Sequence, residues 1–400
     1  MNEPNPAFVT SQPAGMGTDP VPARYYYDPE WFELERKAIF MRSWIQIGHV
    51  CELPEPGSFI VRKLEFAKAS ILITHGKDGK IRAFHNACTH RGTQLTQESE
   101  GKRPLFTCPY HGWTFSNEGD LRAAPDFERF YIEDKKSCAL SRVSVDVCAG
   151  LIFVNLDRNP EQSLHDYIGA ELVARMETLP VAKAKAFTEY VYEVDANWKI
   201  TYDNFQEQYH IRFIHPRSGA AACGPENPFG YPTDFGFYGP HRTEKIWSHP
   251  NPPIAPVQGY SLGMASRFVA EDGIVRTENN QLYFALFPNL FLLGSPATHF
   301  SHVITPISAT RSRGVVRLYW MSEDGSASQR YAREYATCTA FDIHAEDIGV
   351  IEAGQRGLDS EALTHVHFQS NEVLCRHLMH EVCAKVAAYQ QQQAGKEAVR

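Results

Sequence analysis

Two short segments in the first third of this 400-residue chain each supply one cysteine and one histidine. The first is Cys88-Thr-His90, and the second is Cys108-Pro-Tyr-His111. Thiolates and imidazoles repeated at such short spacing are typical metal ligands. Because all four side chains must converge on one metal centre, the residues between them have to fold into a small, tightly connected module. No other feature of the sequence limits the fold as strongly.

Zinc and a Rieske [2Fe–2S] cluster both accept two thiolates and two imidazoles. Structural zinc sites usually take two like residues from one loop, whereas each loop here mixes cysteine with histidine. In a Rieske centre histidines replace the cysteines on one iron, so a mixed loop can hold both irons. Gly92 and Gly112 also allow the backbone to approach a cluster closely. We therefore predict a [2Fe–2S] cluster bound by Cys88, His90, Cys108 and His111.

Composition and charge exclude several classes of protein. The chain carries 39 Lys+Arg against 47 Asp+Glu, and its formal charge of −8 disfavours binding to a nucleic-acid backbone. No uninterrupted apolar run approaches the roughly 20 residues that a membrane span needs. Residues 1–24 are proline-rich and lack the basic patch and apolar core of a signal peptide. The nine cysteines are scattered, unlike a disulfide framework, so we expect a cytoplasmic protein with reduced thiols.

The pattern of apolar residues predicts a β-rich region between an opening helix and a C-terminal part that mixes helices with strands. The predicted helices cover 25–43, 164–177, 198–215, 327–356 and 370–389. The predicted strands cover 58–65, 70–75, 81–85, 113–116, 121–122, 151–155, 277–293 and 313–321. A change of composition at 159–163 places a domain boundary near residue 158. Residues 216–259 contain so many prolines and glycines that we expect an irregular loop able to cover a pocket.

A second cluster of metal-binding residue types lies in the third predicted helix. Asp203, Glu207 and His210 fall at i, i+4 and i+7, which is one helical face. His215 is about 140° out of phase with His210 on an ideal helix. Both histidines can therefore reach one metal only if the helix is distorted or ends, and Pro216 supplies a reason for ending. The alternative is an amphipathic helix with a solvated acidic face and two incidental histidines.

Two imidazoles need a carboxylate to complete the facial triad typical of a non-haem Fe(II) oxygenase. Asp347 shares a helical face with Val350 and Ile351. A carboxylate on such an apolar stripe is costly unless it binds a cation or a hydrogen-bond donor. Glu346 faces elsewhere, and Asp342 lies on the preceding turn. An aspartate that is simply hydrogen-bonded in the core is the alternative for Asp347.

Taken together, the two clusters and the sequence Glu346-Asp347 followed by Gln355-Arg-Gly-Leu358 resemble the Rieske non-haem iron oxygenases. This family contains the alpha subunits, or terminal oxygenases, of ring-hydroxylating dioxygenases and related monooxygenases. The resemblance runs from the opening helix to about residue 360. It implies that the mononuclear Fe(II) is bound by His210, His215 and Asp347.

The resemblance implies an α+β chain in which a small all-β Rieske [2Fe–2S] domain accompanies a larger helix-grip-like catalytic domain with an antiparallel sheet. We accordingly divide the chain into an N-terminal arm and helix (1–45) that packs on the catalytic domain, the Rieske domain (46–158) and the mononuclear iron domain (159–400). The family's subunits form a head-to-tail homotrimer. A carboxylate bridges a cluster histidine of one chain and an iron-binding histidine of the next. Here that electron-transfer bridge is Glu207, with His111 and His210 as its partners.

The resemblance also implies an enzyme that consumes O2 and receives electrons from a separate NAD(P)H reductase, with or without a ferredoxin. The sequence has no acceptable G-x-G-x-x-G fingerprint, which agrees with a separate reductase. We expect hydroxylation of a hydrophobic aromatic or alicyclic small molecule, as in aromatic hydrocarbon catabolism. Because Glu replaces the more usual Asp at the bridge, a monooxygenase of a quaternary ammonium compound is the alternative. A Rieske electron carrier or a zinc-stabilised binding protein without oxygenase chemistry is a further one.

Overall fold

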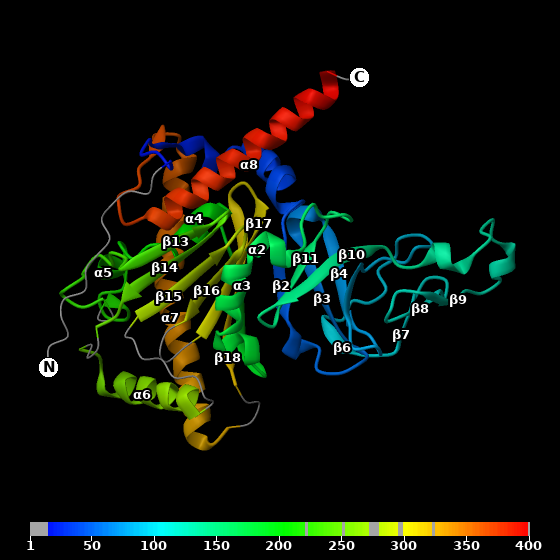
Figure 1. The fold of residues 1–400 in the computed structure, drawn as a ribbon, viewed down its shortest axis with the longest axis horizontal. Helices are drawn as coiled ribbons and strands as arrows, with labels where there is room; N and C mark the ends of the chain where they lie inside the picture. The colour runs from blue at the N-terminus through cyan, green and yellow to red at the C-terminus, as the bar shows by residue number, and fades with distance from the viewer. Residues whose placement is uncertain are drawn as a thin grey trace. The chain divides into compact units, whose positions relative to one another are not determined.

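The structure, a computed structural model, describes residues 15–220, 223–249, 253–271, 280–294, 299–321 and 325–398. The chain divides into two compact units, and most of their helices and strands are labelled in Figure 1. We call Phe40–Glu177 the central unit, because it is the middle segment of the sequence. The described residues before and after it in the sequence form the second unit, which we call the outer unit. Both Cys/His loops belong to the central unit, and the predicted iron ligands belong to the outer unit.

Antiparallel strands supply most of the regular secondary structure of the central unit. They are β2 (Ile45–His49), β3 (Ser58–Leu64), β4 (Ala69–His75), β5 (Ile81–His85), β6 (Glu100–Lys102), β7 (Leu105–Thr107), β8 (Thr114–Ser116), β9 (Leu121–Ala123), β10 (Arg142–Cys148) and β11 (Leu151–Asn155). Seven of them pair in the order β2-β11-β10-β5-β4-β3-β6, with every neighbouring pair antiparallel. The other three form the sheet β7-β8-β9. Short 3₁₀ turns connect the strands at Val50–Glu52, Glu65–Ala67, Phe127–Arg129 and Lys135–Cys138.

Aromatic side chains fill the interior of the central unit around the Cys/His loops. Phe59, Phe106 and Trp113 are almost inaccessible to solvent, and Cys88 and Cys108 belong to the same buried cluster. The rings of Phe59 and Phe106 meet edge to face, with centroids 5.2 Å apart. Aromatic rings contribute large apolar contact areas, so both cysteines are anchored in a well-packed core.

Two helices extend the central unit beyond the boundary near residue 158 that the sequence indicated. They are α2 (Leu164–Ile168), which begins at the N-cap Ser163, and α3 (Ala170–Glu177), and both contact β10. Gly169 separates them, because its φ of 88° ends α2. Helices that pack on a sheet share its core, so the unit continues to the end of α3.

The outer unit is built around a second antiparallel sheet. Its strands are β12 (Ala186–Val194), β13 (Asp234–Tyr238), β14 (His241–Trp247), β15 (Asn280–Leu286), β16 (Leu290–Gly294), β17 (His299–Ser308) and β18 (Arg311–Trp320). They pair in the order β12-β18-β17-β16-β15-β14-β13. Two further short strands, β1 (Val21–Pro22) and β19 (His365–Val366), pair with each other.

Helices of very different length accompany this sheet. They are α1 (Pro29–Glu35), α4 (Trp198–Asp203), α5 (Ile211–Ile214), α6 (Pro256–Glu271), α7 (Ala327–Asp359) and α8 (Val373–Ala398). Short 3₁₀ turns lie at Ala23–Tyr26 and Pro180–Lys183, and a π-helical turn follows α1 at Arg36–Phe40. Figure 1 shows α7 running across one face of the sheet, which is the helix-grip arrangement expected of the larger α+β domain.

The expectation that 216–259 forms one irregular loop is wrong in part. β13 and β14 form a hairpin within it, joined at Gly239-Pro240 and paired outward from Tyr238 and His241. The remaining prolines of this segment gather before β13 and after β14. They therefore leave the strands of the hairpin uninterrupted, since proline is disruptive only where its missing amide is needed.

The long helix α7 begins at a capping box and carries one buried stripe. The Gln329 amide donates to Oγ of Ser326 at 3.2 Å, and the Ser326 amide donates to Oε1 of Gln329 at 2.7 Å. Its buried residues include His344, Asp347 and Ile351, spaced three and four residues apart on one face. The predicted helix 327–356 is therefore confirmed, and its buried stripe carries two side chains able to bind metals or polar ligands.

A buried ion pair fastens α1 to α4 within the outer unit. Glu35 and Lys199 are both inaccessible to solvent, and Nζ of Lys199 lies 2.7 Å from Oε1 of Glu35. The same carboxylate accepts hydrogen bonds from the indole N–H groups of Trp31 at 2.7 Å and Trp198 at 2.8 Å. Three donors thus satisfy the buried charge and offset much of its desolvation.

We expect Glu35→Ala to lower the free energy of unfolding by about 3–5 kcal/mol, because the Lys199 ammonium stays buried without its counter-charge. Chemical denaturation followed by circular dichroism measures this loss. Glu33→Ala is the matched control, since Glu33 lies on the same helix and pairs with Arg36 and Lys37 at the surface. Equal stability of the Glu35 and Glu33 variants would contradict the role given to the buried pair.

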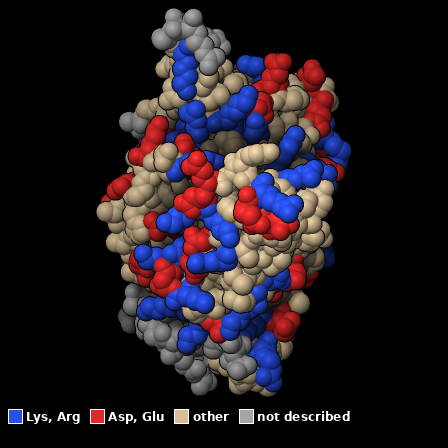
Figure 2. Space-filling view, turned by 90° about the vertical axis from the view of Figure 1, so that its right-hand side faces the viewer, with Lys and Arg blue, Asp and Glu red and all other residues tan. Residues whose placement is uncertain are grey.

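The surface carries charges of both signs. Basic and acidic side chains are interspersed on the face drawn in Figure 2. Mixed charge of this kind agrees with the small acidic excess of the whole sequence and gives this face no continuous basic stripe for a phosphate backbone. Among the described helices, none is long and apolar enough to cross a membrane.

Candidate functional site

The two Cys/His loops of the central unit share one backbone pattern. In each, the cysteine amide bonds to a carbonyl beyond the glycine, and the glycine amide bonds back to the cysteine carbonyl. The four bonds are Cys88 N–H to Thr93 O (2.8 Å), Gly92 N–H to Cys88 O (2.8 Å), Cys108 N–H to Trp113 O (2.7 Å) and Gly112 N–H to Cys108 O (3.1 Å). Both glycines are left-handed, with φ of 80° at Gly92 and 70° at Gly112, which few other residues tolerate.

The loops bring the four predicted cluster ligands together. The Cys88 and Cys108 side chains are buried and belong to the same cluster of the core. The imidazole rings of His90 and His111 are neighbours, with centroids 4.5 Å apart and an interplanar angle of 69°. Burial raises the pKa of the Cys88 thiol, and the backbone amides of His90 and Arg91 act against that rise. One pair of thiols and one pair of imidazoles form the donor set of a Rieske cluster.

Aromatic neighbours hold His90 in place. Its ring stacks on Trp113 with centroids 4.9 Å apart and meets the edge of Phe130 at 5.3 Å. Nδ1 of His90 is buried and has no hydrogen-bond partner among the described residues. A buried nitrogen without a partner is unfavourable unless a metal binds it. The orphaned nitrogen and the donor set therefore both fit the predicted [2Fe–2S] cluster.

The single helix predicted around the second cluster is wrong, because the chain forms two short helices with a turn between them. α4 ends at Asp203, and α5 begins at Ile211. The Glu207 carboxylate accepts hydrogen bonds from the backbone amides of Tyr209 and His210, which removes those amides from a helical ladder. The common helical face expected for Asp203, Glu207 and His210 consequently does not form.

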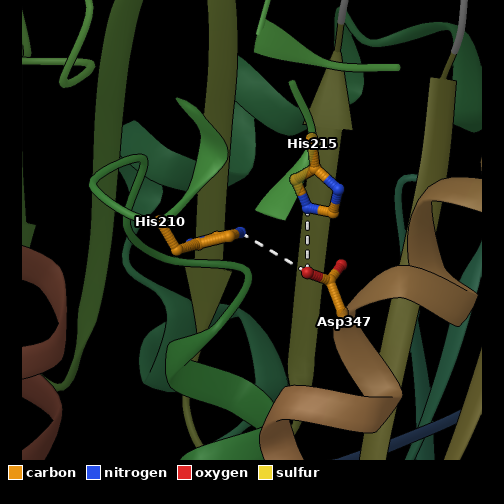
Figure 3. Close-up of side chains that lie close together, drawn as sticks. All are labelled: His210, His215 and Asp347. Atoms are coloured by element: carbon orange, nitrogen blue, oxygen red, sulfur yellow. Dashed lines mark ion pairs between the residues drawn. The ribbon is translucent and has the colours of Figure 1, made fainter. Parts of the chain in front are cut away.

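The break places the two histidines at opposite ends of α5. His210 immediately precedes the helix, and His215 follows it before Pro216. The angular mismatch of a continuous helix is thereby removed, and both Nε2 atoms point to Oδ1 of Asp347 (Figure 3). The distances to that oxygen are 2.9 Å from His215 and 3.5 Å from His210. Potential ligand atoms of the three residues all lie within 4.8 Å of one another.

Of the three acidic residues considered on α7, the structure brings Asp347 to the histidines. Asp347 is 3% exposed and His215 is 2% exposed, whereas Asp342 lies at the surface. Glu346 instead contacts the far side of the His215 ring. Within the part of the chain that the structure describes, no other His, Cys, Asp and Glu side chains form a group of three as compact as this one.

Carboxylates hold the far nitrogens of both imidazoles. Nδ1 of His215 lies 2.6 Å from Oε2 of Glu346, which also accepts a hydrogen bond from Ser218 at 2.6 Å. Nδ1 of His210 contacts Oε1 of Glu207. Contacts of this kind place the ring proton on Nδ1 and leave the lone pair of Nε2 for a metal. Sequence reasoning weighed Glu346 only as a ligand and missed this orienting role.

The electrostatics of the three-residue group favour a cation. Burial lowers the pKa of His215, but the hydrogen bonds and charges of Asp347 and Glu346 outweigh it, so that the net pKa is raised. Asn204 donates from Nδ2 to Oδ1 of Asp347 at 3.3 Å and so steadies the carboxylate. Two imidazole nitrogens and a carboxylate around one point form the donor set of a facial triad, which fits non-haem iron and leaves positions open for other ligands.

A cavity of about 310 Å³ adjoins this group, between the sheet and α7 of the outer unit. Much of its wall is apolar, and the apolar members include Phe205, Ile211, Ile254, Phe291, Leu293, Phe300, Leu318, Ala336 and Ile343. No Lys or Arg is among the described residues that line it. The cavity therefore offers a largely apolar wall and no basic side chain, among the described residues, that could pair with an anionic group.

Sequence reasoning also missed a pair of buried histidines, of which His344 lines the cavity and His302 packs against it. His344 lies one helical turn before Asp347, and its ring meets Tyr192 edge to face with centroids 4.2 Å apart. Nε2 of His302 lies 2.5 Å from the hydroxyl of Tyr192. Burial lowers the pKa of His344 to about 4, although the Asp347 carboxylate opposes the shift. Its spacing of three residues from Asp347 could have indicated that His344 lies near the site, but nothing in the sequence around His302 indicates this.

Two known protein families match this chain in succession. Residues 43–140 match the Rieske [2Fe-2S] domain, and residues 181–388 match the ring hydroxylating alpha subunit (catalytic domain). The carnitine monooxygenase oxygenase subunit of Acinetobacter baumannii is 29% identical over 342 residues, which cover 85% of each chain. The alpha subunit of 2-aminobenzenesulfonate 2,3-dioxygenase from an Alcaligenes species is 35% identical over 195 residues, which cover 48% of each chain.

Solved structures agree on the fold. A quaternary ammonium Rieske monooxygenase has a TM-score of 0.76 at 24% identity, covering 93% of this chain and 97% of its own. Naphthalene 1,2-dioxygenase from a Rhodococcus species has a TM-score of 0.75 at 22% identity, covering 92% and 94%. The predicted α+β architecture is thereby confirmed. Because the catalytic family spans more than half of the chain and the Rieske family precedes it, this protein belongs to the Rieske non-haem iron oxygenases, as a ring-hydroxylating alpha subunit that combines a [2Fe–2S] domain with a non-haem iron domain.

Proposed function

We propose that this terminal oxygenase uses the ligand sets described above. The catalytic iron is held by His210, His215 and Asp347, and the [2Fe–2S] cluster by Cys88, His90, Cys108 and His111. The observation that carries the iron assignment is the approach of both Nε2 atoms to one carboxylate oxygen, at 2.9 and 3.5 Å. When bound, the two groups supply one-electron transfer and O2 activation. The surrounding side chains determine where that chemistry acts.

Carboxylates outside the ligand set orient each imidazole. Glu346 accepts a hydrogen bond from Nδ1–H of His215, and Glu207 accepts one from Nδ1–H of His210. The lone pairs of both Nε2 atoms therefore stay available. Asp347 projects from the buried stripe of α7 beside them. These three residues would hold the iron and leave positions for O2, while the apolar cavity would hold the substrate beside them and keep bulk water away.

We further infer that Glu207 conducts electrons between neighbouring chains of a homotrimer. Its carboxylate contacts Nδ1 of His210, and Tyr110 next to the cluster ligand His111 is 57% exposed, so this loop is available to a second chain. In the trimer the carboxylate joins His111 of one chain to His210 of the next through hydrogen bonds. A separate reductase that oxidises NAD(P)H, with or without a ferredoxin, supplies the electrons.

The substrate that the cavity suits best is a hydrophobic aromatic or alicyclic molecule. Phe, Leu, Ile and Ala side chains gain free energy when a ring covers them. Carnitine and glycine betaine, for which several relatives are named, carry a carboxylate as well as a quaternary ammonium group. With no Lys or Arg among the described lining residues, that carboxylate enters without a counter-charge, which is costly.

A quaternary ammonium substrate is the second candidate. It is favoured by the carnitine monooxygenase relative that matches 85% of the chain and by the glutamate at position 207. Aromatic side chains at the cavity, among them Tyr190, Phe205 and Phe291, offer faces that attract a cation. A positively charged substrate without a carboxylate would satisfy these observations.

We expect kcat/KM for naphthalene to exceed that for carnitine by about 100-fold or more, because burying the unpaired carboxylate costs about 3 kcal/mol. The assay uses iron-replete protein, a reductase of a Rieske oxygenase and NADH, and it follows O2 uptake together with the hydroxylated product. Choline is a quaternary ammonium compound without a carboxylate, so its turnover separates the effect of the positive charge from the effect of the carboxylate. Turnover of choline or carnitine without turnover of naphthalene would replace the aromatic assignment by the second candidate.

A further inference from the structure

The His344 imidazole lines the cavity without a hydrogen-bond partner. The side chain is 4% exposed, and it reaches the cavity from the buried stripe of α7, one turn before Asp347. Nε2 is fully buried and unpartnered, and neither ring nitrogen makes a hydrogen bond to a described residue. Buried polar groups in native proteins are nearly always paired, so an exception at a cavity wall calls for a ligand.

Two other polar groups at the cavity wall differ from His344 because they already have partners. Oγ of Ser261 donates to the Val257 carbonyl at 2.9 Å, and the hydroxyl of Tyr283 donates to Oε1 of Gln281 at 2.5 Å. Asn204 leaves its Oδ1 unpartnered, but its amide group donates to Asp347 and so belongs to the iron site. Among these residues, His344 is the one with its whole hydrogen-bonding capacity unused.

The aromatic rings around His344 fix the position of its imidazole without giving it a hydrogen bond. Tyr192 meets it edge to face, and the hydroxyl of Tyr192 is engaged with Nε2 of His302. Phe205 and His302 pack against it with centroids 5.5 Å away. Gly314 makes room for this arrangement, since a Cβ there would lie 2.1 Å from ring atoms of Tyr192. A rigid imidazole with unused nitrogens is prepared for a group that arrives with the substrate.

We propose that His344 hydrogen-bonds a hydroxyl group on the substrate and thereby selects hydroxylated aromatic compounds. This inference rests on the proposed use of the cavity for aromatic rings. A neutral imidazole offers one donor and one acceptor, and a phenolic hydroxyl offers the complementary pair on a flat apolar ring. Because His344 and Asp347 are three residues apart on α7, about 4.5 Å of axial rise separates the hydroxyl anchor from the iron ligand. A ring fixed at one edge by His344 would then present a constant edge to the iron.

The test compares two ligands of nearly equal shape, 2-naphthol and 2-methylnaphthalene, on the holoenzyme without O2. Equilibrium dialysis gives the dissociation constant of each, so that the readout does not depend on turnover. We expect His344→Leu and His344→Phe to weaken the preference for 2-naphthol about tenfold relative to the unsubstituted protein, which corresponds to about 1.4 kcal/mol. His344→Gln, which keeps a donor and an acceptor, is expected to retain most of the preference.

Ser261→Ala is the matched control, since Ser261 also lines the cavity but already has a partner, and its preference should not change. If the folded apolar variants still bind 2-methylnaphthalene and keep the full preference for 2-naphthol, the role of His344 is overturned, while the proposed aromatic substrate stands. Failure of the unsubstituted protein to bind either naphthalene overturns the proposed aromatic substrate instead. Two apolar variants are made so that the result does not depend on one of them folding.

Discussion

Asp347→Ala is expected to abolish hydroxylation while leaving the visible spectrum of the [2Fe–2S] cluster unchanged. Both Nε2 atoms of the site approach Oδ1 of this residue, so its removal takes away the only carboxylate among the proposed iron ligands. The cluster ligands belong to the other compact unit and share no residue with the iron site. We expect the rate of product formation to fall by at least about 100-fold. Product yield, together with absorption spectra, measures both effects on one sample.

Asp342→Ala is the control for Asp347→Ala, because Asp342 is an exposed carboxylate on the same helix. It should retain the iron and the full rate of hydroxylation. Loss of the cluster spectrum in Asp347→Ala would show that the residue supports the central unit and not the iron site alone. Wild-type hydroxylation by this variant would remove Asp347 from the ligand set.

The second large effect is expected from Glu207→Gln. Glutamine keeps an oxygen that can accept a hydrogen bond, but it lacks the charge that holds the protonated Nδ1 of His210. Both metal centres should therefore be retained, while electron transfer from the cluster to the iron slows by about 10–100-fold. Rapid mixing of the reduced protein with O2 and substrate measures that rate as reoxidation of the cluster in a single turnover.

Glu193→Gln is the control for Glu207→Gln, since Glu193 pairs with Arg311 at the surface of the sheet edge. Its single-turnover rate should equal that of the unsubstituted protein. If Glu207→Gln reoxidises its cluster as fast as this control, Glu207 is not the bridge. If it loses iron instead, Glu207 acts mainly by orienting His210.

Local patterns predicted the parts of the fold in which one short segment contains all the information. β5 and β11 were located with their observed bounds, because short apolar runs between turn residues are typical of buried strands. The Cys/His loops were located for the same reason, since ligands and glycines lie within a few residues of one another. α7 was predicted from its helical period and starts at the expected residue.

The parts of the fold that the sequence did not predict depend on contacts that local patterns do not reveal. The continuous helix through the second cluster failed because the Glu207 carboxylate captures two backbone amides, which helical period alone does not reveal. β17 lies in a segment for which no strand was predicted, and it is fixed by its pairing with β16 and β18. Whether such a segment forms a strand depends on its pairing with strands that are distant in the sequence.

The candidate site shows the same division. His210 and His215 are neighbours in sequence, and their residue types and spacing were sufficient to select them. Asp347 was selected partly through its place on a helical face and partly through resemblance to the family. His302 packs against His344 because β17 and β12 place it beside Tyr192, so a single sequence carries no local signal for it.

One chain of this protein should hold a [2Fe–2S] cluster and, at separate residues, a single non-haem iron. Iron and acid-labile sulfide analysis of iron-replete protein, paired with electron paramagnetic resonance after reduction, tests it most directly. We expect a cluster signal with two irons and two sulfides per chain, plus a further iron that disappears in Asp347→Ala while the signal stays. Protein that contains zinc in place of iron, or that lacks the sulfide and the signal, would contradict it.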